Sequence, residues 1–183
     1  MLAVGLSGTI VGSKTKTAVE HTLNILREKY PDIETTLLDL GEYDVQFSDG
    51  RNYLDYEGDT GTVTKTIMDA DILVIGTPIF QASIPGTLKN IFDLLPQNAL
   101  QGKVVGIIAT AGSARHYLVP EQQLKPILTY LKARIVQSYV FVEEQDFFRK
   151  QIVNDDVKFR IERLAEDIAL LAKTYRHLEE TQE

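Results

Sequence analysis

The chain has 183 residues, of which 44% are hydrophobic and 25% charged, as expected for one soluble globular domain spanning residues 1–183. It contains no cysteine, which excludes disulfides, thiolate metal sites and cysteine nucleophiles. A net charge of −7 without a basic stripe argues against nucleic-acid binding, and no apolar run approaches the roughly 18 residues of a membrane span. We therefore expect a cytoplasmic protein that partners with neither nucleic acid nor membrane.

Apolar runs alternate with amphipathic stretches along the chain. The predicted strands cover residues 2–6, 33–40, 72–76, 104–109 and 135–142. The predicted helices cover residues 14–30, 60–69, 85–95, 121–132 and 155–178. Several strands are almost continuously apolar, as are strands covered on both faces of a parallel sheet. This alternation predicts a doubly wound α/β sandwich of five parallel strands with helices on both faces, and flavodoxin-like order 2-1-3-4-5 is the topology we expect.

The connection 41–58 is unusually long for such a fold, and residues 41–59 carry six carboxylates against a single base, Arg51. A solvated loop is the simplest interpretation of this acidic segment. Loops of this length are otherwise functional or disordered.

Ligands of open α/β sheets bind beyond the carboxyl ends of the strands, near the switch in strand order. That rule brings together the loops 7–15, 77–83 and 110–116. The function of the chain therefore depends on what these three loops hold.

The first loop, SGTIVGSKT, nearly matches a triphosphate-binding P-loop, but Ser13 replaces its second glycine and no acid follows the strand 72–76. Four hydroxyls at the start of a helix, from Ser7, Thr9, Ser13 and Thr15, suit a phosphate monoester instead. The alternative is a polar loop that merely caps the helix.

The other two loops suit a flat heteroaromatic ring. Pro78, Phe80 and Gln81 supply a fixed backbone, an aromatic face and an amide, although Phe80 is equally typical of ordinary loop packing. The small residues of ATAGSARH let the backbone approach a ring edge closely.

The stretch TPIFQASIPGTLKN resembles the TPxYxxSxxGxLKN signature of the NADPH-dependent FMN reductase family, which consists of flavodoxin-like flavoproteins. The following LLPQNALQGKVVGIIATAGSARHYLVPEQQLKPILTYLKARIV is similar to the sulfonate-linked branch, whose members supply reduced flavin to monooxygenases. The resemblance implies that FMN is bound by the three loops. The implied cofactor-binding residues are Ser7, Thr9, Ser13, Thr15, Pro78, Ile79, Phe80, Gln81, Thr110, Ala111, Gly112 and Ser113.

The activity that the resemblance implies is hydride transfer from NADPH or NADH to flavin N5. The flavin carries this chemistry, so we predict no catalytic side chain and no metal site. Three alternatives stay open. One is an enzyme that retains FMN and reduces quinones, azo dyes or nitro compounds, and another is a non-enzymatic electron carrier whose acidic segment steers redox partners. The third is an interaction module that has kept the fold and lost the flavin.

Two further expectations come from the resemblance. Members of the sulfonate-linked branch have a tyrosine or histidine that bulges the fourth helix, and Gln122 at the matching position implies an unbulged helix here. The family also implies a homodimer or homotetramer, with a monooxygenase or a small-molecule electron acceptor as partner. The helix face Leu88, Ile91, Phe92 and Leu95 fits either that subunit interface or ordinary core.

Overall fold

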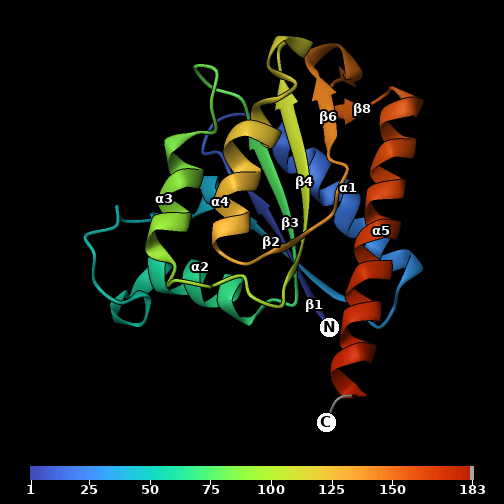
Figure 1. Ribbon diagram of the computed structural model, residues 1–183. Helices are drawn as coiled ribbons and strands as arrows, with labels where there is room; N and C mark the ends of the chain where they lie inside the picture. Colours follow the sequence, from blue (N-terminus) through green and yellow to red (C-terminus); the bar gives the residue numbers. More distant parts are fainter. Residues whose placement is uncertain (182–183) are drawn as a thin grey trace.

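The parallel sheet of the computed structural model, which describes residues 1–181, has the strand order β2-β1-β3-β4-β5 (Figure 1). Its strands are β1 (Leu2–Ser7), β2 (Glu34–Asp39), β3 (Ile72–Pro78), β4 (Val104–Ala111) and β5 (Arg134–Ile135). The expected doubly wound α/β sandwich with the order 2-1-3-4-5 is confirmed. None of the helices within residues 1–181 is long and apolar enough to cross a membrane.

The fifth strand differs from its prediction because it is interrupted. β5 pairs with the start of β4, and β6 (Val140–Glu143) pairs with the end of β4. Between them, Gln137 and Ser138 are exposed, and the Gln137 carbonyl accepts a hydrogen bond from Lys125 Nζ at 2.7 Å. The edge of the sheet is thus completed in two short segments.

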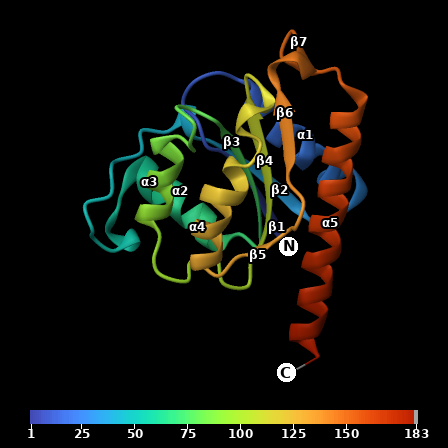
Figure 2. The same ribbon diagram turned by 45° about the horizontal axis from the view of Figure 1, so that its top comes forward.

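Helices cover both faces of the sheet (Figure 2). α1 (Lys14–Lys29) and α5 (Asp155–Glu180) pack on one face. α2 (Gly58–Asp69), α3 (Gly86–Leu94) and α4 (Lys125–Tyr130) pack on the other. Side chains of β3 alternate between the two cores, with Leu73 and Ile75 facing the second group of helices and Ile72 and Val74 the first.

Gly76 lets the start of α1 approach the end of β3. A Cβ atom at Gly76 would lie 2.4 Å from Val19 Cγ2 and 2.8 Å from Thr15 Cγ2, far inside van der Waals contact. The carbonyl of Gly76 also accepts the N–H of Gly8 at 2.8 Å. The loop after β1 is therefore fixed close to the loop after β3.

The fourth helix corrects the expectation drawn from Gln122. Pro120–Leu124 forms a π-helical turn, in which the Lys125 N–H bonds to the Pro120 carbonyl five residues earlier. The helix is therefore bulged although it carries neither tyrosine nor histidine at that position. Pro126 supplies a physical reason, because a proline has no N–H to donate to the carbonyl four residues back and its ring clashes with that carbonyl. A wider turn relieves both problems.

The acidic connection is ordered against α3. Asn90 donates to the Gln46 carbonyl and accepts from the Ser48 N–H, both at 2.9 Å, and the Ser48 hydroxyl donates to the Asp93 carbonyl at 3.1 Å. The loop also contains the short 3-10 turns Leu40–Glu42 and Tyr53–Asp55.

The apolar face considered for a subunit interface belongs to the core of this chain. Leu88, Ile91, Phe92 and Leu95 are all buried in the cluster shared with α2 and α4. Of the two roles that the sequence left open for these residues, the structure therefore shows core packing.

Candidate functional site

A cavity of about 470 Å³ opens where β1, β3, β4 and β6 end. Its volume lies within the range of about 300–1,000 Å³ that is typical of small-molecule sites. The cavity is lined by Val11, Gly12, Ser13, Lys14, Thr15, Pro78, Ile79, Phe80, Thr110, Ala111, Gly112, Val142, Glu144, Phe147 and Lys150.

The structure brings most of the predicted site residues together in this lining. Those that line the cavity are Ser13, Thr15, Pro78, Ile79, Phe80, Thr110, Ala111 and Gly112. Those outside the lining are Ser7, Thr9, Gln81 and Ser113. All three predicted loops therefore contribute to one cavity.

The amino end of α1 faces this cavity with its donors available. Ser13 holds the N-cap position, but its side chain makes no capping hydrogen bond. Gly12, Ser13, Lys14 and Thr15 all line the cavity, so the first N–H groups of the helix lie beside it. Helix capping therefore does not account for the Ser13 hydroxyl.

The other two predicted hydroxyls of the first loop, those of Thr9 and Ser7, do not line the cavity. Thr9 uses its hydroxyl within the loop, donating to the Val11 carbonyl and accepting from the Val11 N–H, both at 3.0 Å. Ser7 is fully buried at the end of β1, and its Oγ has no hydrogen-bond partner among residues 1–181. A buried polar atom without a hydrogen-bond partner is uncommon in folded proteins, so the unpaired Ser7 hydroxyl beside the loop is a feature that needs an explanation.

The first and third loops are joined by a buried contact between side chains. Thr15 Oγ1 and Thr110 Oγ1 lie 2.7 Å apart, and both residues line the cavity. Ser113 is half-buried nearby, and its side chain does not cap the 3-10 turn Ala114–His116 that follows.

The second loop makes a tight turn at residues 80–83. Phe80 and Ser83 exchange backbone hydrogen bonds of 2.9 and 3.0 Å around Gln81 and Ala82. Both central residues have positive φ values, 49° and 60°, which costs on the order of 1–3 kcal/mol each for residues other than glycine. Phe80 lines the cavity while keeping 43% of its surface exposed, and Gln81 is not among the lining residues.

A fourth wall follows β6 and was not predicted. Glu144, Phe147 and Lys150 line the cavity, and the last two belong to the hairpin of β7 (Phe147–Phe148) and β8 (Gln151–Ile152) or its turn. Lys14 forms an ion pair with Glu144 and lies 5.8 Å from the centre of the Phe147 ring. The carboxyl-end rule, applied to the fifth strand as well, was the signal that points to this segment.

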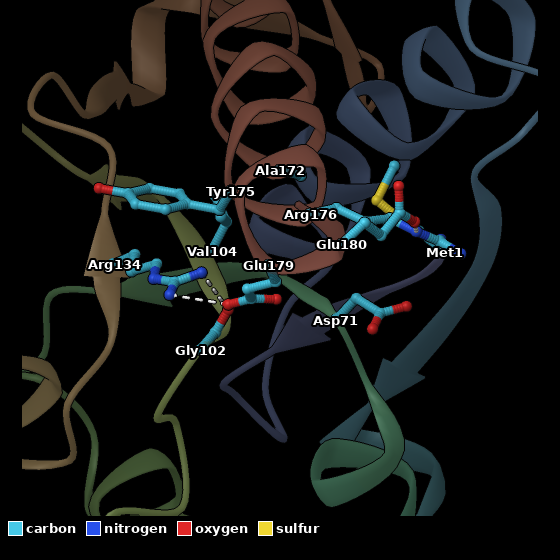
Figure 3. A pocket seen from close by; sticks show the side chains of 10 residues that line it. All are labelled: Met1, Asp71, Gly102, Val104, Arg134, Ala172, Tyr175, Arg176, Glu179 and Glu180. Carbon is cyan, nitrogen blue, oxygen red and sulfur yellow. Dashed lines mark hydrogen bonds and ion pairs between the residues drawn. The ribbon is translucent and has the colours of Figure 1, made fainter. Parts of the chain in front are cut away.

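A second cavity, of about 400 Å³, lies at the amino ends of the strands, and Figure 3 shows the side chains that line it. There Arg134 donates to Glu179 at 2.9 Å and lies 3.9 Å from the centre of the Tyr175 ring. Asp71 accepts the Leu2 N–H at 2.7 Å. These groups find partners within the chain, and the cavity is on the side where open α/β sheets do not bind ligands. We therefore assign the functional site to the first cavity.

The sequence matches the NADPH-dependent FMN reductase family over residues 1–147. An NAD(P)H-dependent FAD/FMN reductase from Geobacillus thermodenitrificans is 43% identical over 169 residues, or 92% of this chain and 91% of the relative. The NADH-dependent FMN reductase SfnF from Pseudomonas fluorescens is 34% identical over 173 residues, or 94% of this chain and 92% of the relative.

Solved structures agree with this relationship. An oxidoreductase from Corynebacterium diphtheriae has a TM-score of 0.76 and 27% identity, covering 94% of this chain and 97% of its own. A Streptococcus pneumonia flavodoxin has a TM-score of 0.63 at 14% identity, covering 93% and 99%, and shows the shared fold alone.

The sheet order and the carboxyl-end cavity define a flavodoxin-like α/β protein. More narrowly, the chain belongs to the NADPH-dependent FMN reductase family, whose activity is the reduction of FMN by NAD(P)H. The predicted family, activity and cofactors are thereby confirmed.

Proposed function

We propose that the cavity at the carboxyl ends of the strands is where FMN binds. Its phosphate lies against Ser13, Thr15 and the first N–H groups of α1, and its ring lies between the loops 78–81 and 110–113. The observation that carries this placement is that the amino end of α1, with the free hydroxyl of Ser13, opens into the cavity walled by those two loops. A helix amino end attracts a phosphate through its unpaired donors and its dipole.

The residues present fit this cofactor. The hydroxyl donors add no charge. Lys14 and Lys150 put two cations at the cavity wall, and because Lys14 pairs with the Glu144 carboxylate there, Lys150 is the excess positive charge available to the phosphates of FMN and of the nicotinamide coenzyme. Ser7 has an unpaired hydroxyl that suits a phosphate chemically, but it lies outside the lining, so we give the phosphate contacts to Ser13 and Thr15.

Bound FMN supplies the N5 atom that accepts a hydride from NAD(P)H. The work of the chain is to position the two rings. Pro78, Ile79 and Phe80 form an apolar wall on one side, and Ala111 with Gly112 leaves room for close approach on the other. We infer that Gln81 and Ser113 act at the rim, because both lie outside the lining beside residues that belong to it.

We further propose that the flavin exchanges with solvent as a substrate. The support is the π-helical turn Pro120–Leu124, since a bulged fourth helix is a feature of the branch that releases reduced flavin. The turn replaces the unbulged helix that Gln122 implied. A monooxygenase is then the expected acceptor, and reduction of small molecules by retained FMN is the second candidate.

A homodimer or homotetramer is part of the same proposal. Its support is a groove between α3 and α4, where Pro126, Ile127 and the 67% exposed Tyr130 line the surface together with the buried core residues Phe92 and Leu95. Light scattering after gel filtration tests it: Tyr130→Glu should give a monomer, while Tyr53→Glu on the acidic loop should keep the wild-type mass. The single domain and the cytoplasmic location stay predictions.

The experiment for the flavin site is an FMN titration of the purified protein, followed by flavin fluorescence, together with the rate of NADPH oxidation. We expect Ser13→Ala to raise the dissociation constant of FMN by about tenfold, the value of a hydrogen bond to a charged group. Thr62→Ala, on the exposed face of α2, is the control. Equal FMN affinity in Ser13→Ala and wild type would overturn the placement, and a flavin that stays bound through gel filtration would overturn its release.

A further inference from the structure

The tip of the loop 80–83 is held by a single side chain from the π-helical turn. The Gln123 side-chain amide donates to the Ala82 carbonyl at 3.2 Å, and its carbonyl oxygen accepts the Ser83 hydroxyl. The base of the loop is fixed separately, by the Ile79 N–H donating to the Thr110 carbonyl at 3.0 Å. Base and tip are therefore anchored by different elements.

The tip has a conformation that needs such an anchor. Gln81 and Ala82 both lie in the left-handed region, which residues with a Cβ atom avoid. Strained residues of this kind persist when the surrounding structure fixes them. The internal bonds between Phe80 and Ser83 close the turn, but they do not set its direction relative to the cavity.

The π-helical turn accounts for the reach of Gln123. Pro120 and Leu124 are buried, Glu121 and Gln122 are exposed, and Gln123 lies half-buried between them. Because the wide turn accommodates one residue more than an α-helical turn, Gln123 faces the loop while Leu124 still packs into the core.

We propose that Gln123 is a positioning residue for the flavin ring: through the π-helical turn it fixes the strained tip of the loop that carries Phe80. The inference rests on the proposed placement of FMN, because Phe80 is the side chain of this loop that lines the cavity. Loss of the Gln123 amide should let Phe80 move and weaken flavin binding without removing any group that touches the flavin.

The test uses a tryptophan as a reporter, since the chain contains none. Phe80→Trp places it in the loop, and Gln123→Met removes the amide while keeping the length of the side chain. Gln122→Met is the matched control, because its side chain makes none of the hydrogen bonds seen within residues 1–181. Without flavin, the tryptophan anisotropy should fall in the Phe80→Trp/Gln123→Met protein and stay unchanged with Gln122→Met.

Kinetics then connect the loop to the reaction. In the protein that keeps Phe80, Gln123→Met should raise KM for FMN by about tenfold, with little change in kcat. A tenfold change corresponds to the net free energy of about two ordinary hydrogen bonds. Ser83→Ala should raise KM less, and adding Ser83→Ala to Gln123→Met should change little further, because the two residues share one bond.

The possible failures are distinguishable. Equal anisotropy in the Gln123→Met and Gln122→Met proteins would show that Gln123 does not hold the loop, and would overturn the proposal. FMN that binds without quenching the tryptophan would overturn the placement of FMN beside Phe80, and with it the role of Gln123 in positioning the flavin. The anisotropy measured without flavin would still decide whether Gln123 holds the loop.

Discussion

The hydroxyls of Thr15 and Thr110 lie 2.7 Å apart and join the first turn of α1 to the end of β4. Both residues are almost completely buried, at 3% and 6% exposure, so the pair links two walls of the proposed flavin cavity away from bulk water. In the proposed placement of FMN, this contact joins the part of the cavity that holds the phosphate to the part that holds the ring.

Breaking that contact from one side should destabilise the protein. Thr15→Val leaves the Thr110 hydroxyl buried without its partner, which should lower the free energy of unfolding by about 1–2 kcal/mol, and Thr110→Val should do the same. The double variant should lose less than the sum, because no unpaired hydroxyl remains. Urea unfolding of the four proteins measures this coupling, and strictly additive losses would show that the two hydroxyls do not depend on each other.

Removing the hydroxyl of Ser7 should affect stability alone, and removing that of Ser13 should affect FMN affinity alone. Ser7→Ala removes a buried group without a partner, so the free energy of unfolding should stay the same or rise by up to about 1 kcal/mol. FMN affinity should not change. Ser13→Ala should leave unfolding within about 0.5 kcal/mol of wild type and weaken FMN binding.

Denaturant titrations with and without FMN separate these effects for both variants. A loss of FMN affinity in Ser7→Ala as large as that in Ser13→Ala would move the phosphate contact to Ser7, deeper than the cavity lining.

The strands and the three loops were predictable from the sequence because two strong rules apply to them. Continuous apolar runs such as 72–76 identify strands buried on both faces, and the carboxyl-end rule then places the loops together. The split of the fifth strand was missed because the apolar residues on both sides of Gln137 and Ser138 resemble one continuous run, whereas these two polar residues mark the gap in pairing with β4.

Two further features, the wall after β6 and the π-helical turn, gave only weak signals in the sequence. The wall formed by Phe147 and Lys150 comes from two-residue strands whose turn, Arg149 and Lys150, carries none of the Asn-Gly or Asp-Gly signals of a tight hairpin. The π-helical turn continues the apolar spacing of a helix, and its signal was Pro126 rather than any change in periodicity. Amphipathic spacing on α3 likewise could not separate core from interface.

Lys150 should contribute to the binding of the anionic ligands. It lines the cavity, while its neighbour Arg149 lies outside the lining with its guanidinium 5.3 Å from the centre of the Phe148 ring. Both residues are exposed and have positive φ values, 46° and 66°, so alanine meets similar backbone strain at either position.

Lys150→Ala should therefore raise KM for NADPH or FMN by about three- to tenfold at low salt, and the difference should shrink as salt screens the charge. Arg149→Ala is the matched control and should stay close to wild type. Steady-state kinetics at two ionic strengths give the comparison. Equal effects of the two variants would mean that Lys150 acts only through the general charge of the hairpin.

Stability should fall on mild acidification because of His21. Burial in α1, reinforced by nearby Lys158, lowers the pKa of His21 below its ordinary value of 6.5, against the opposing charges of Glu28 and Glu162. The folded state therefore binds fewer protons than the unfolded state just below pH 6.5, and the stability that neutral His21 contributes is lost as the pH falls through that region.

Urea unfolding between about pH 7.5 and about pH 5 should show this loss in wild type and a smaller loss in His21→Gln, which has no proton to gain. His177→Gln, near the exposed end of α5, should behave as wild type does. Wild type and His21→Gln share every other titrating group, so the difference between them isolates the histidine. If both proteins lost the same stability over this range, the neutral form of His21 would not be the one that the fold favours.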